Sequence, residues 1–562
     1  MFKKKTYFIS IQSFLTAAFL TLLFYGFNPA TEQSIPVNIS GKTKPLASKI
    51  NSIKNSGKIF LSKQILNIDN NSQAVVKVRG YLKNYTQLSL DEEARDRLLN
   101  TREDNILFKI PLNESEFMEI ELTKESVVSE NFKAGTLSGN GNVGYFNYTP
   151  GLYYRGIIKG DNESFASLSI FNDFVMAVIS NRQGNWNLSS LKGENSLYSE
   201  NYVFYNDADL TAHKDFTCGV SDESPLFDKR SYGWSHGSSN PNPPQLVKKY
   251  FECDFKMYQD FGNNVASVNN YVTGFFNSCI ALYQQDSINT SIQQIFVWTT
   301  PDVYASLNDN LSILKLFGGR LQNNINGDLA HWISTRTDIS GGVAWVGVLC
   351  TPFEPSDSSG RYGVSVIETT YLPFPQYSWT VNVVAHEMGH NLGSNHTHNC
   401  SWPGGPIDSC YAVEGGCYGG PLIPRIGTVM SYCHLNASVN LALGFGPLPG
   451  DTIRAHVSRA GCLTIGISQI GTEIPSGYEL NQNYPNPFNP VTNIKFSIPK
   501  QGNVKLLIYD AAGKEIAELV NGQLSPGIYK VDFDAADFSS GVYFYKLISD
   551  GYTVTRKMIL IK

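Results

Sequence analysis

The stretch that decides the fold of this chain is Val383-Val384-Ala385-His386-Glu387-Met388-Gly389-His390-Asn391-Leu392-Gly393-Ser394-Asn395-His396. His386 and His390 are four residues apart, so on a helix their imidazoles project from the same face. Two neutral imidazoles at this spacing can bind one metal ion. We therefore predict a helix through this stretch that carries a metal pair.

The residues around this pair complete the pattern of a catalytic zinc site. Gly393 tolerates positive φ, so we expect it to end the helix and turn the chain. The turn returns His396 as a third ligand and leaves the fourth position of zinc open for water. Glu387 lies beside the first ligand, where it can take a proton from the zinc-bound water and pass it to a leaving amine.

The longer pattern carries a family resemblance. H-E-x-x-H alone also occurs on ordinary helix surfaces, but H-E-x-x-H-x-x-G-x-x-H resembles the signature of the metzincin zinc peptidases. Metzincins also have a methionine turn beneath the metal, and Gly427-Thr428-Val429-Met430-Ser431-Tyr432 is similar to it, with Met430 as the methionine. The resemblance implies an α/β zincin fold and a zinc metalloendopeptidase.

Length and charge bound the remaining possibilities. The chain has 562 residues, which suggests three or four domains, and a net charge of −5. Such a charge gives no basic footprint, so we expect no nucleic-acid partner.

The amino terminus has the parts of a secretory signal peptide. Lys3, Lys4 and Lys5 precede an apolar run from Tyr7 to Phe27, so we assign residues 1–30 to the signal, with an uncleaved membrane anchor as the alternative. No later stretch is long and apolar enough to span a bilayer, so we expect no stable transmembrane segment after signal cleavage.

We assign residues 31–230 to a β-rich propeptide. Tyr154–Gly160 and Glu163–Ser169 resemble the propeptide of reprolysin (adamalysin) peptidases, and an unrelated β-domain is the alternative. Near its end, Cys218-Gly219-Val220 looks like the cysteine switch of metzincin zymogens. A thiolate from a pro-segment can fill the open zinc position. Lys229-Arg230 offers a basic cleavage site, and residues 231–245 form a linker rich in Ser, Asn, Gly and Pro.

Residues 246–464 are the predicted catalytic domain. Strand-like runs at 248–254 and 292–299 flank a helical period at 263–283. The resemblance to reprolysins covers most of this region, including 326–333 and 342–347. It implies that Gly342–Val348 is an edge strand over the cleft, able to take an extended peptide as an added strand. An ordinary covered strand is the alternative.

Two positions depart from the reprolysin pattern or add to it. Reprolysins usually have Asp after the third histidine, where this chain has Thr397. Tyr432, two residues after Met430, matches the position from which astacins and serralysins supply a tyrosine near zinc. It would bind zinc as a fifth ligand, stabilise the oxyanion, or be a buried structural tyrosine.

The resemblance also bears on calcium. Glu252 and Asp328 match positions that bind calcium in some reprolysins, and carboxylates suit that ion. Ile465 stands where the same site would need an oxygen ligand.

All nine cysteines fall between Cys218 and Cys462. In an oxidising compartment we expect eight to pair, with Cys218 left over. The family resemblance implies a Cys350–Cys462 bridge and leaves Cys253 with Cys279 as a local pair. Pairing among Cys400, Cys410, Cys417 and Cys433 stays open.

After a linker at 465–477, residues 478–562 contain no cysteine and show regular β-prone runs and turns, typical of an Ig-like β-sandwich. Asn483–Pro490, Ser539–Phe544 and Arg556–Leu560 together look like the carboxy-terminal sorting domain of type IX secretion cargo. This resemblance implies the type IX secretion machinery as a partner. It also implies export across both membranes of a Gram-negative bacterium, with release or retention at the cell surface. An Ig-like substrate-binding module is the alternative.

The sequence thus predicts a multidomain zymogen of a secreted zinc endopeptidase that cuts extracellular proteins or peptides. Two other functions stay open. One is a non-catalytic adhesion protein on a metzincin fold, which would have no need of Glu387. The other is a zinc hydrolase of a non-protein peptide such as a peptidoglycan stem.

Overall fold

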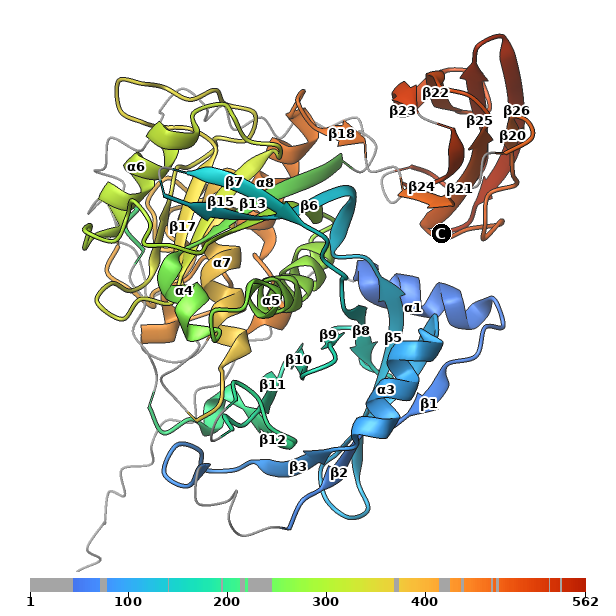
Figure 1. The fold of residues 1–562 in the computed structure, drawn as a ribbon. Helices are drawn as coiled ribbons and strands as arrows, with labels where there is room; N and C mark the ends of the chain where they lie inside the picture. The colour runs from blue at the N-terminus through green and yellow to red at the C-terminus, as the bar shows by residue number, and fades with distance from the viewer. Residues whose placement is uncertain are drawn as a thin grey trace, which may run out of the picture. The chain divides into compact units, whose positions relative to one another are not determined.

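The computed structural model describes residues 44–70, 78–139, 141–193, 196–212, 218–220, 245–367, 373–413, 425–435, 439–465, 468–471, 475–524, 526–535 and 538–562. The predicted signal peptide, Lys229-Arg230, Cys417 and nearly all of the predicted linker 231–245 lie outside these residues. The chain is multidomain and β-rich, with three separate regions of sheet (Figure 1). No described helix has the length and apolarity that crossing a membrane requires.

The N-terminal domain, residues 44–212, is built on a ten-stranded curled sheet in the order β1-β4-β5-β8-β9-β10-β11-β12-β3-β2. Its helices are α1 (Pro45–Asn55) and α3 (Glu92–Thr101). Its strands are β1 (Leu61–Lys63), β2 (Leu66–Ile68), β3 (Thr86–Leu90), β4 (Asn105–Pro111), β5 (Phe117–Glu125), β8 (Leu152–Ile158), β9 (Phe165–Ile170), β10 (Val175–Asn181), β11 (Gly184–Ser190) and β12 (Asn201–Asn206). The β-prone run at 174–179 lies largely in β10.

The second domain, residues 245–465, contains the predicted α/β elements. Its strands are β13 (Gln245–Cys253), β14 (Asn289–Trp298), β15 (Leu329–Ser334), β16 (Gly342–Ala344), β17 (Tyr362–Val366) and β18 (Thr464–Ile465). Its helices are α4 (Phe255–Asp260), α5 (Val265–Gln285), α6 (Asn310–Leu321), α7 (Tyr377–Asn391) and α8 (Pro447–Arg459). The predicted first strand, long helix and second strand are confirmed as β13, α5 and β14.

The sheet of this second domain includes strands from the N-terminal region. Its order is β16-β17-β15-β13-β14-β6-β7, where β6 (Val128–Ser138) and β7 (Asn142–Phe146) form a hairpin. Strand β6 runs parallel to β14, with Ala134 opposite Ile295 and Leu137 opposite Trp298. Strands from the N-terminal region and from residues 245–465 therefore belong to one continuous sheet.

The C-terminal region forms two four-stranded antiparallel sheets that share one apolar core. One sheet has the order β19-β24-β21-β20 and the other β23-β22-β25-β26. The strands are β19 (Ser468–Gly471), β20 (Glu479–Leu480), β21 (Val491–Ile498), β22 (Gly502–Tyr509), β23 (Glu515–Leu524), β24 (Gly527–Asp534), β25 (Gly541–Ser549) and β26 (Tyr552–Leu560). The β-prone runs at 504–509, 528–533 and 542–548 lie in β22, β24 and β25.

The cysteine prediction is partly wrong. Cys350 and Cys462 form a disulfide, as do Cys410 and Cys433, and Cys400 is also disulfide-bonded. Cys253 and Cys279, however, form no disulfide and are buried, and the half-buried Cys218 forms no disulfide either, as expected. Three described cysteines are therefore unbridged instead of one, because Cys253 on β13 and Cys279 on α5 each pack into apolar core as small hydrophobic side chains.

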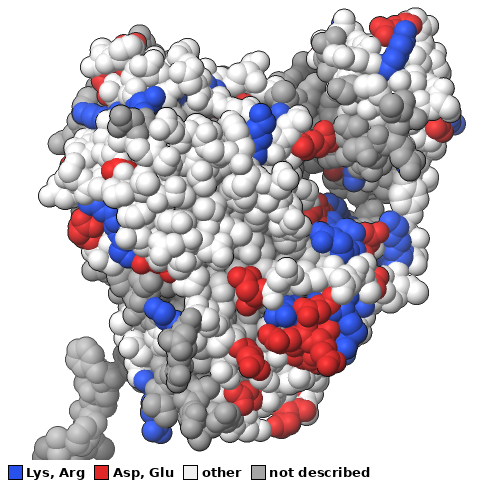
Figure 2. Space-filling view, in the orientation of Figure 1, with Lys and Arg blue, Asp and Glu red and all other residues white. Residues whose placement is uncertain are grey.

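Charged side chains gather over α3, where acidic and basic groups alternate (Figure 2). Arg97 pairs with Glu93, and Arg95 pairs with Glu92 and Asp96. On the face that Figure 2 shows, the charges of this region are therefore of mixed sign.

Lys249 on β13 is a buried lysine in the core of the second domain. Its side chain is fully buried, and Nζ lies 3.4 Å from Nδ1 of His331, whose Nε2 lies 2.8 Å from the Ser365 hydroxyl. Burial lowers the pKa of Lys249 to about 7 and holds the pKa of His331 well below its usual range. Both groups are therefore neutral above pH 7.

We predict that Lys249 makes stability rise with pH. The unfolded lysine, with a pKa of about 10.4, binds a proton between pH 7 and 10 that the folded protein does not. The free energy of unfolding should therefore increase by up to about 1.4 kcal/mol per pH unit above pH 7.

Urea unfolding followed by tryptophan fluorescence at pH 7.0 and 8.5 measures this increase. Lys249→Met, which cannot titrate, should lose it. Parallel profiles of the two proteins would contradict the prediction.

Candidate metal centre

Helix α7 positions the first two histidines and the glutamate. All 15 of its residues are buried, and it ends at Asn391, close to the predicted end. The predicted turn at Gly393 is confirmed, with φ of +100°, a value that favours glycine. The turn carries the chain back, and His396 comes to lie beside His390.

Three imidazole nitrogens converge on one point. Nε2 of His390 lies 3.2 Å from Nε2 of His386 and 3.1 Å from Nε2 of His396. A tetrahedral zinc ion with nitrogen ligands at about 2.0–2.1 Å separates its ligand nitrogens by roughly 3.3–3.4 Å. The donor set and its spacing therefore fit zinc, and the side chains are fully or almost fully buried.

The opposite ring nitrogens are held by backbone carbonyls. Nδ1 of His386 lies 2.8 Å from the Val429 carbonyl, and Nδ1 of His390 lies 2.7 Å from the Ser394 carbonyl. An Nδ1–H donated to a carbonyl leaves the lone pair on Nε2, the form that binds metal. Burial lowers the pKa of His386 well below its usual range, so this imidazole is neutral.

Glu387 lies against the edge strand of the sheet. Its carboxyl is fully buried, and burial raises its pKa well above the usual range. A Cβ at Gly342 on β16 would lie 2.6 Å from Cγ and Oε1 of Glu387. Because Gly342 has no side chain, the Glu387 side chain can occupy this space.

Cys218 reaches the same centre. Its Sγ lies 3.5 Å from His390 Nε2 and 3.5 Å from Glu387 Oε2, and Sγ and the histidine ligand atoms all lie within 4.8 Å of one another. Zinc–sulfur and zinc–nitrogen bonds of about 2.3 and 2.0 Å place sulfur roughly 3.5 Å from nitrogen. The thiol is therefore where a fourth zinc ligand belongs.

The backbone around Cys218 pairs with the edge strand. Cys218 forms a parallel β-bridge with Gly342, and the Gly219 amide donates to the Gly342 carbonyl at 2.8 Å. Strand β16 is thus at the sheet edge, as predicted, and in this form residues 218–220 occupy it.

Met430 and Tyr432 both lie close to the histidine cluster. Met430 is fully buried beside α7, where a Cβ at Gly389 would lie 2.6 Å from its Sδ. The Tyr432 ring lies 4.7 Å from the His396 ring, and its hydroxyl donates to the Cys218 carbonyl at 3.1 Å. In this form the Tyr432 hydroxyl therefore contacts the segment that fills the cleft.

Asp408 was missed in the sequence. Thr397, which stands where reprolysins have Asp, donates its hydroxyl to the Asp408 carboxylate, and the Thr397 amide donates to the Met430 carbonyl at 3.1 Å. A carboxylate therefore lies beside Thr397 in the folded chain, although it belongs to a residue 11 positions later in the sequence. Only the chain turn between residues 397 and 408 brings it there, so no local signal identified it.

The structure does not bring the two expected calcium ligands together. Glu252 is fully buried and accepts hydrogen bonds from Tyr250, Trp298, Tyr304 and Arg320. Asp328 instead accepts the Lys248 amide at 2.8 Å, and it precedes Leu329, which pairs with Lys249 three residues before Glu252. Four donors already satisfy Glu252, so this carboxylate does not fit calcium.

Three converging imidazoles thus lie beside a buried glutamate, in a group of side chains that could hold a metal ion. Residues 244–439 match the family model described as metallo-peptidase family M12, of the reprolysin type, and residues 482–562 match the secretion system C-terminal sorting domain. These two matches cover the regions in which the sequence resembles reprolysins and type IX secretion cargo. Both resemblances noted in the sequence are confirmed.

Likeness to solved structures is weak. The structure of a chaperone-substrate complex aligns over 52% of this chain and 39% of that chain, with 11% identity and a TM-score of 0.23. The endo-β-1,4-mannanase from Thermotoga petrophila aligns over 20% of this chain and 24% of its own, with 13% identity and a TM-score of 0.11. The chain spans well under two thirds of either protein, and at these scores neither likeness carries an argument.

We predict that Gly342→Ala disables the site without removing its metal. The added methyl group displaces the Glu387 carboxyl, and misplacement of a catalytic group by about 1 Å can cost on the order of 100-fold in rate. Hydrolysis of an unstructured protein and the zinc content should be measured together.

Gly319→Ala on α6 is the matched control, because a Cβ there meets nothing within 4 Å. It should keep full activity. An active Gly342→Ala enzyme would show that the space beside Glu387 is not required.

Proposed function

We propose that this chain is the zymogen of a secreted zinc endopeptidase. His386, His390 and His396 hold the zinc, and Glu387 is the general base. The observation that carries the proposal is that the Nε2 atoms of His386 and His396 lie 3.2 and 3.1 Å from Nε2 of His390, beside a buried carboxyl.

Zinc, when bound, supplies Lewis-acid chemistry that polarises a peptide carbonyl and acidifies water. The Glu387 carboxylate takes a proton from the attacking water and gives it to the nitrogen of the scissile bond as that bond breaks.

The edge strand β16 positions the substrate in this proposal. Its Gly342 carbonyl accepts a backbone amide from residue 219, so the same edge can hold an extended peptide. Tyr432 is placed to donate a hydrogen bond to a carbonyl oxygen in the cleft, since its hydroxyl already donates to the Cys218 carbonyl. We assign it to the oxyanion in the active enzyme.

Cys218 keeps the zymogen inactive in this proposal. Its thiolate takes the fourth zinc position and excludes water, while Gly219 holds the segment on β16. Cleavage within residues 221–244 releases the block. The sorting-domain match indicates secretion or a cell-surface location in a Bacteroidetes-type bacterium, so the substrates we propose are extracellular proteins.

We predict that Glu387→Gln abolishes hydrolysis while zinc stays bound. Loss of the proton acceptor should lower the rate by about 10²–10⁴-fold, because the amide keeps the shape but not the basicity. Casein hydrolysis by the activated enzyme and zinc content by atomic absorption test this.

The control is Glu354→Gln, an exposed glutamate of the same domain, which should leave the rate unchanged. Full activity of Glu387→Gln would remove the general base from the mechanism and favour a non-catalytic role for this side chain.

A second prediction concerns metal removal. A zinc-bound Cys218 is protected from alkylation, so a chelator should raise the labelling rate of this thiol by at least about tenfold. Mass spectrometry of the iodoacetamide-treated chain identifies the labelled residue, and circular dichroism checks that the fold persists.

Cys253 and Cys279 serve as internal controls, because both are free but fully buried. A labelling rate of Cys218 that does not respond to the chelator would contradict the cysteine switch.

A further inference from the structure

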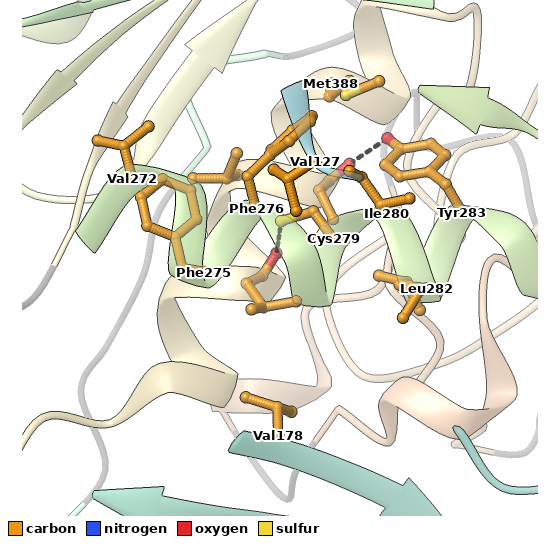
Figure 3. Close-up of a cluster of buried hydrophobic side chains, with 14 of the residues drawn as sticks. Val127, Val178, Val272, Phe275, Phe276, Cys279, Ile280, Leu282, Tyr283 and Met388 are labelled. Atoms are coloured by element: carbon orange, nitrogen blue, oxygen red, sulfur yellow. Dashed lines mark hydrogen bonds between the residues drawn. The ribbon is translucent and has the colours of Figure 1, made fainter. Parts of the chain in front are cut away.

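The long helix α5 of the peptidase domain is buried on all sides. Of its 21 residues, 17 are buried, although a helix covering one face of a sheet is normally apolar along a single stripe. One side of α5 faces the peptidase sheet and α7, as its Tyr283 hydroxyl bond to the Ala385 carbonyl shows (Figure 3). Something else covers the other side.

That cover is the N-terminal domain. Met176 and Phe171 lie against Gly274, where a Cβ would meet the Met176 sulfur at 2.2 Å. Val178 of β10 and Val127 belong to the same buried cluster as Phe275, Phe276 and Ile280 of α5 (Figure 3).

The middle strands of the N-terminal sheet are buried on both faces. Strands β9 and β10 are buried at every residue. Alternate residues such as Leu168 and Ile179 fill the domain's own core, while Met176 and Val178 pack toward α5. A sheet meant to detach would be expected to present one polar face to solvent.

Buried polar contacts join the two domains at the same interface. Arg155 donates to Asn277 of α5 at 2.9 Å, and the Ser167 and Ser278 hydroxyls lie 2.6 Å apart. If the domains separated, these polar groups would lose their hydrogen-bond partners, and the lost bonds would raise the free energy of separation.

The N-terminal domain also caps the zinc helix. The N-cap residue of α7, Gln376, makes no side-chain capping bond. Instead the Ser378 amide in the first turn donates to Asn187 Oδ1 at 2.7 Å, and the Ser378 hydroxyl donates to Asp207 at 2.8 Å. The cap of the helix that holds His386 and His390 is thus supplied by another domain.

The segment after the methionine turn is held in the same way. Asn185 accepts the Leu441 amide at 2.9 Å and donates to the Val439 carbonyl at 2.7 Å, and Ser180 accepts the Ala442 amide at 2.8 Å. The Asn440 amide in turn donates to the Gly427 carbonyl at 2.8 Å. The N-terminal domain therefore holds both the first turn of α7 and the segment that follows the methionine turn through hydrogen bonds.

We infer that the N-terminal domain is a permanent subunit of the active enzyme instead of a discarded propeptide. Cleavage after residue 220 then yields a two-chain complex joined by the β6–β14 pairing and the α5 interface. Only the segment around Cys218 has to leave the cleft. The inference rests on the proposed function in one respect, because the place of cleavage comes from the proposed zymogen. Its test does not require peptidase activity.

The test replaces Lys229-Arg230 with the recognition sequence of a site-specific protease, and the purified chain is cut in native buffer. Size-exclusion chromatography with light scattering should show both fragments in one peak with their summed mass at micromolar concentration. Separation of the fragments in native buffer, with the peptidase fragment monodisperse and helical, would overturn the inference.

A matched pair of variants sharpens the test. Asn187→Ala removes the cap of α7 and should speed exchange of the cut N-terminal fragment against a labelled copy by about tenfold. Asn51→Ala, which removes an exposed bond to Asn162 within the N-terminal domain, should leave the exchange rate unchanged. Equal exchange rates for both variants would contradict the role of the cap.

Peptidase activity is then a separate readout. A stable two-chain complex without hydrolysis leaves the subunit inference standing and counts against the proposed function. Hydrolysis by an isolated, folded peptidase fragment supports the function and overturns the inference.

Discussion

The structure depends on holding in a fixed place one helix whose own N-cap residue makes no capping bond. Helix α7 carries His386, Glu387 and His390, and all of its residues are buried, so every side of it must be packed. Sheet strands, helix α5, the methionine turn and the N-terminal domain each cover a part of it. The position of a metal-binding nitrogen is thereby set by contacts from segments that are far apart in the sequence.

Two glycines show how tightly the centre is assembled. Gly342 admits the Glu387 carboxyl against the edge strand, and Gly389 admits the Met430 sulfur against the zinc helix. At both positions a single methyl group would lie within 2.6 Å of its neighbour. The base and the methionine turn are therefore placed by the absence of side chains as much as by their presence.

The local parts of this centre could be predicted from the sequence. The i, i+4 spacing of the histidines, the glycine at positive φ and the β-prone runs are short-range signals that depend on neighbouring residues. The pairing of β6 with β14, the cap of α7 by Asn187 and the Thr397–Asp408 contact join residues far apart in the chain or across an irregular turn. The same limit applies to Cys253 and Cys279. A bridge between them would require a short Cα–Cα distance, which the spacing in sequence does not reveal, and the bridge does not form.

The central claim is a zinc ion bound by three histidines and blocked by one cysteine. Zinc K-edge X-ray absorption of the uncut chain, beside its Cys218→Ser variant, tests it most directly. The account predicts three nitrogen ligands at about 2.0 Å and one sulfur at about 2.3 Å, with the sulfur lost in the variant. A zinc environment without sulfur in the uncut chain, or with several sulfurs, would contradict it.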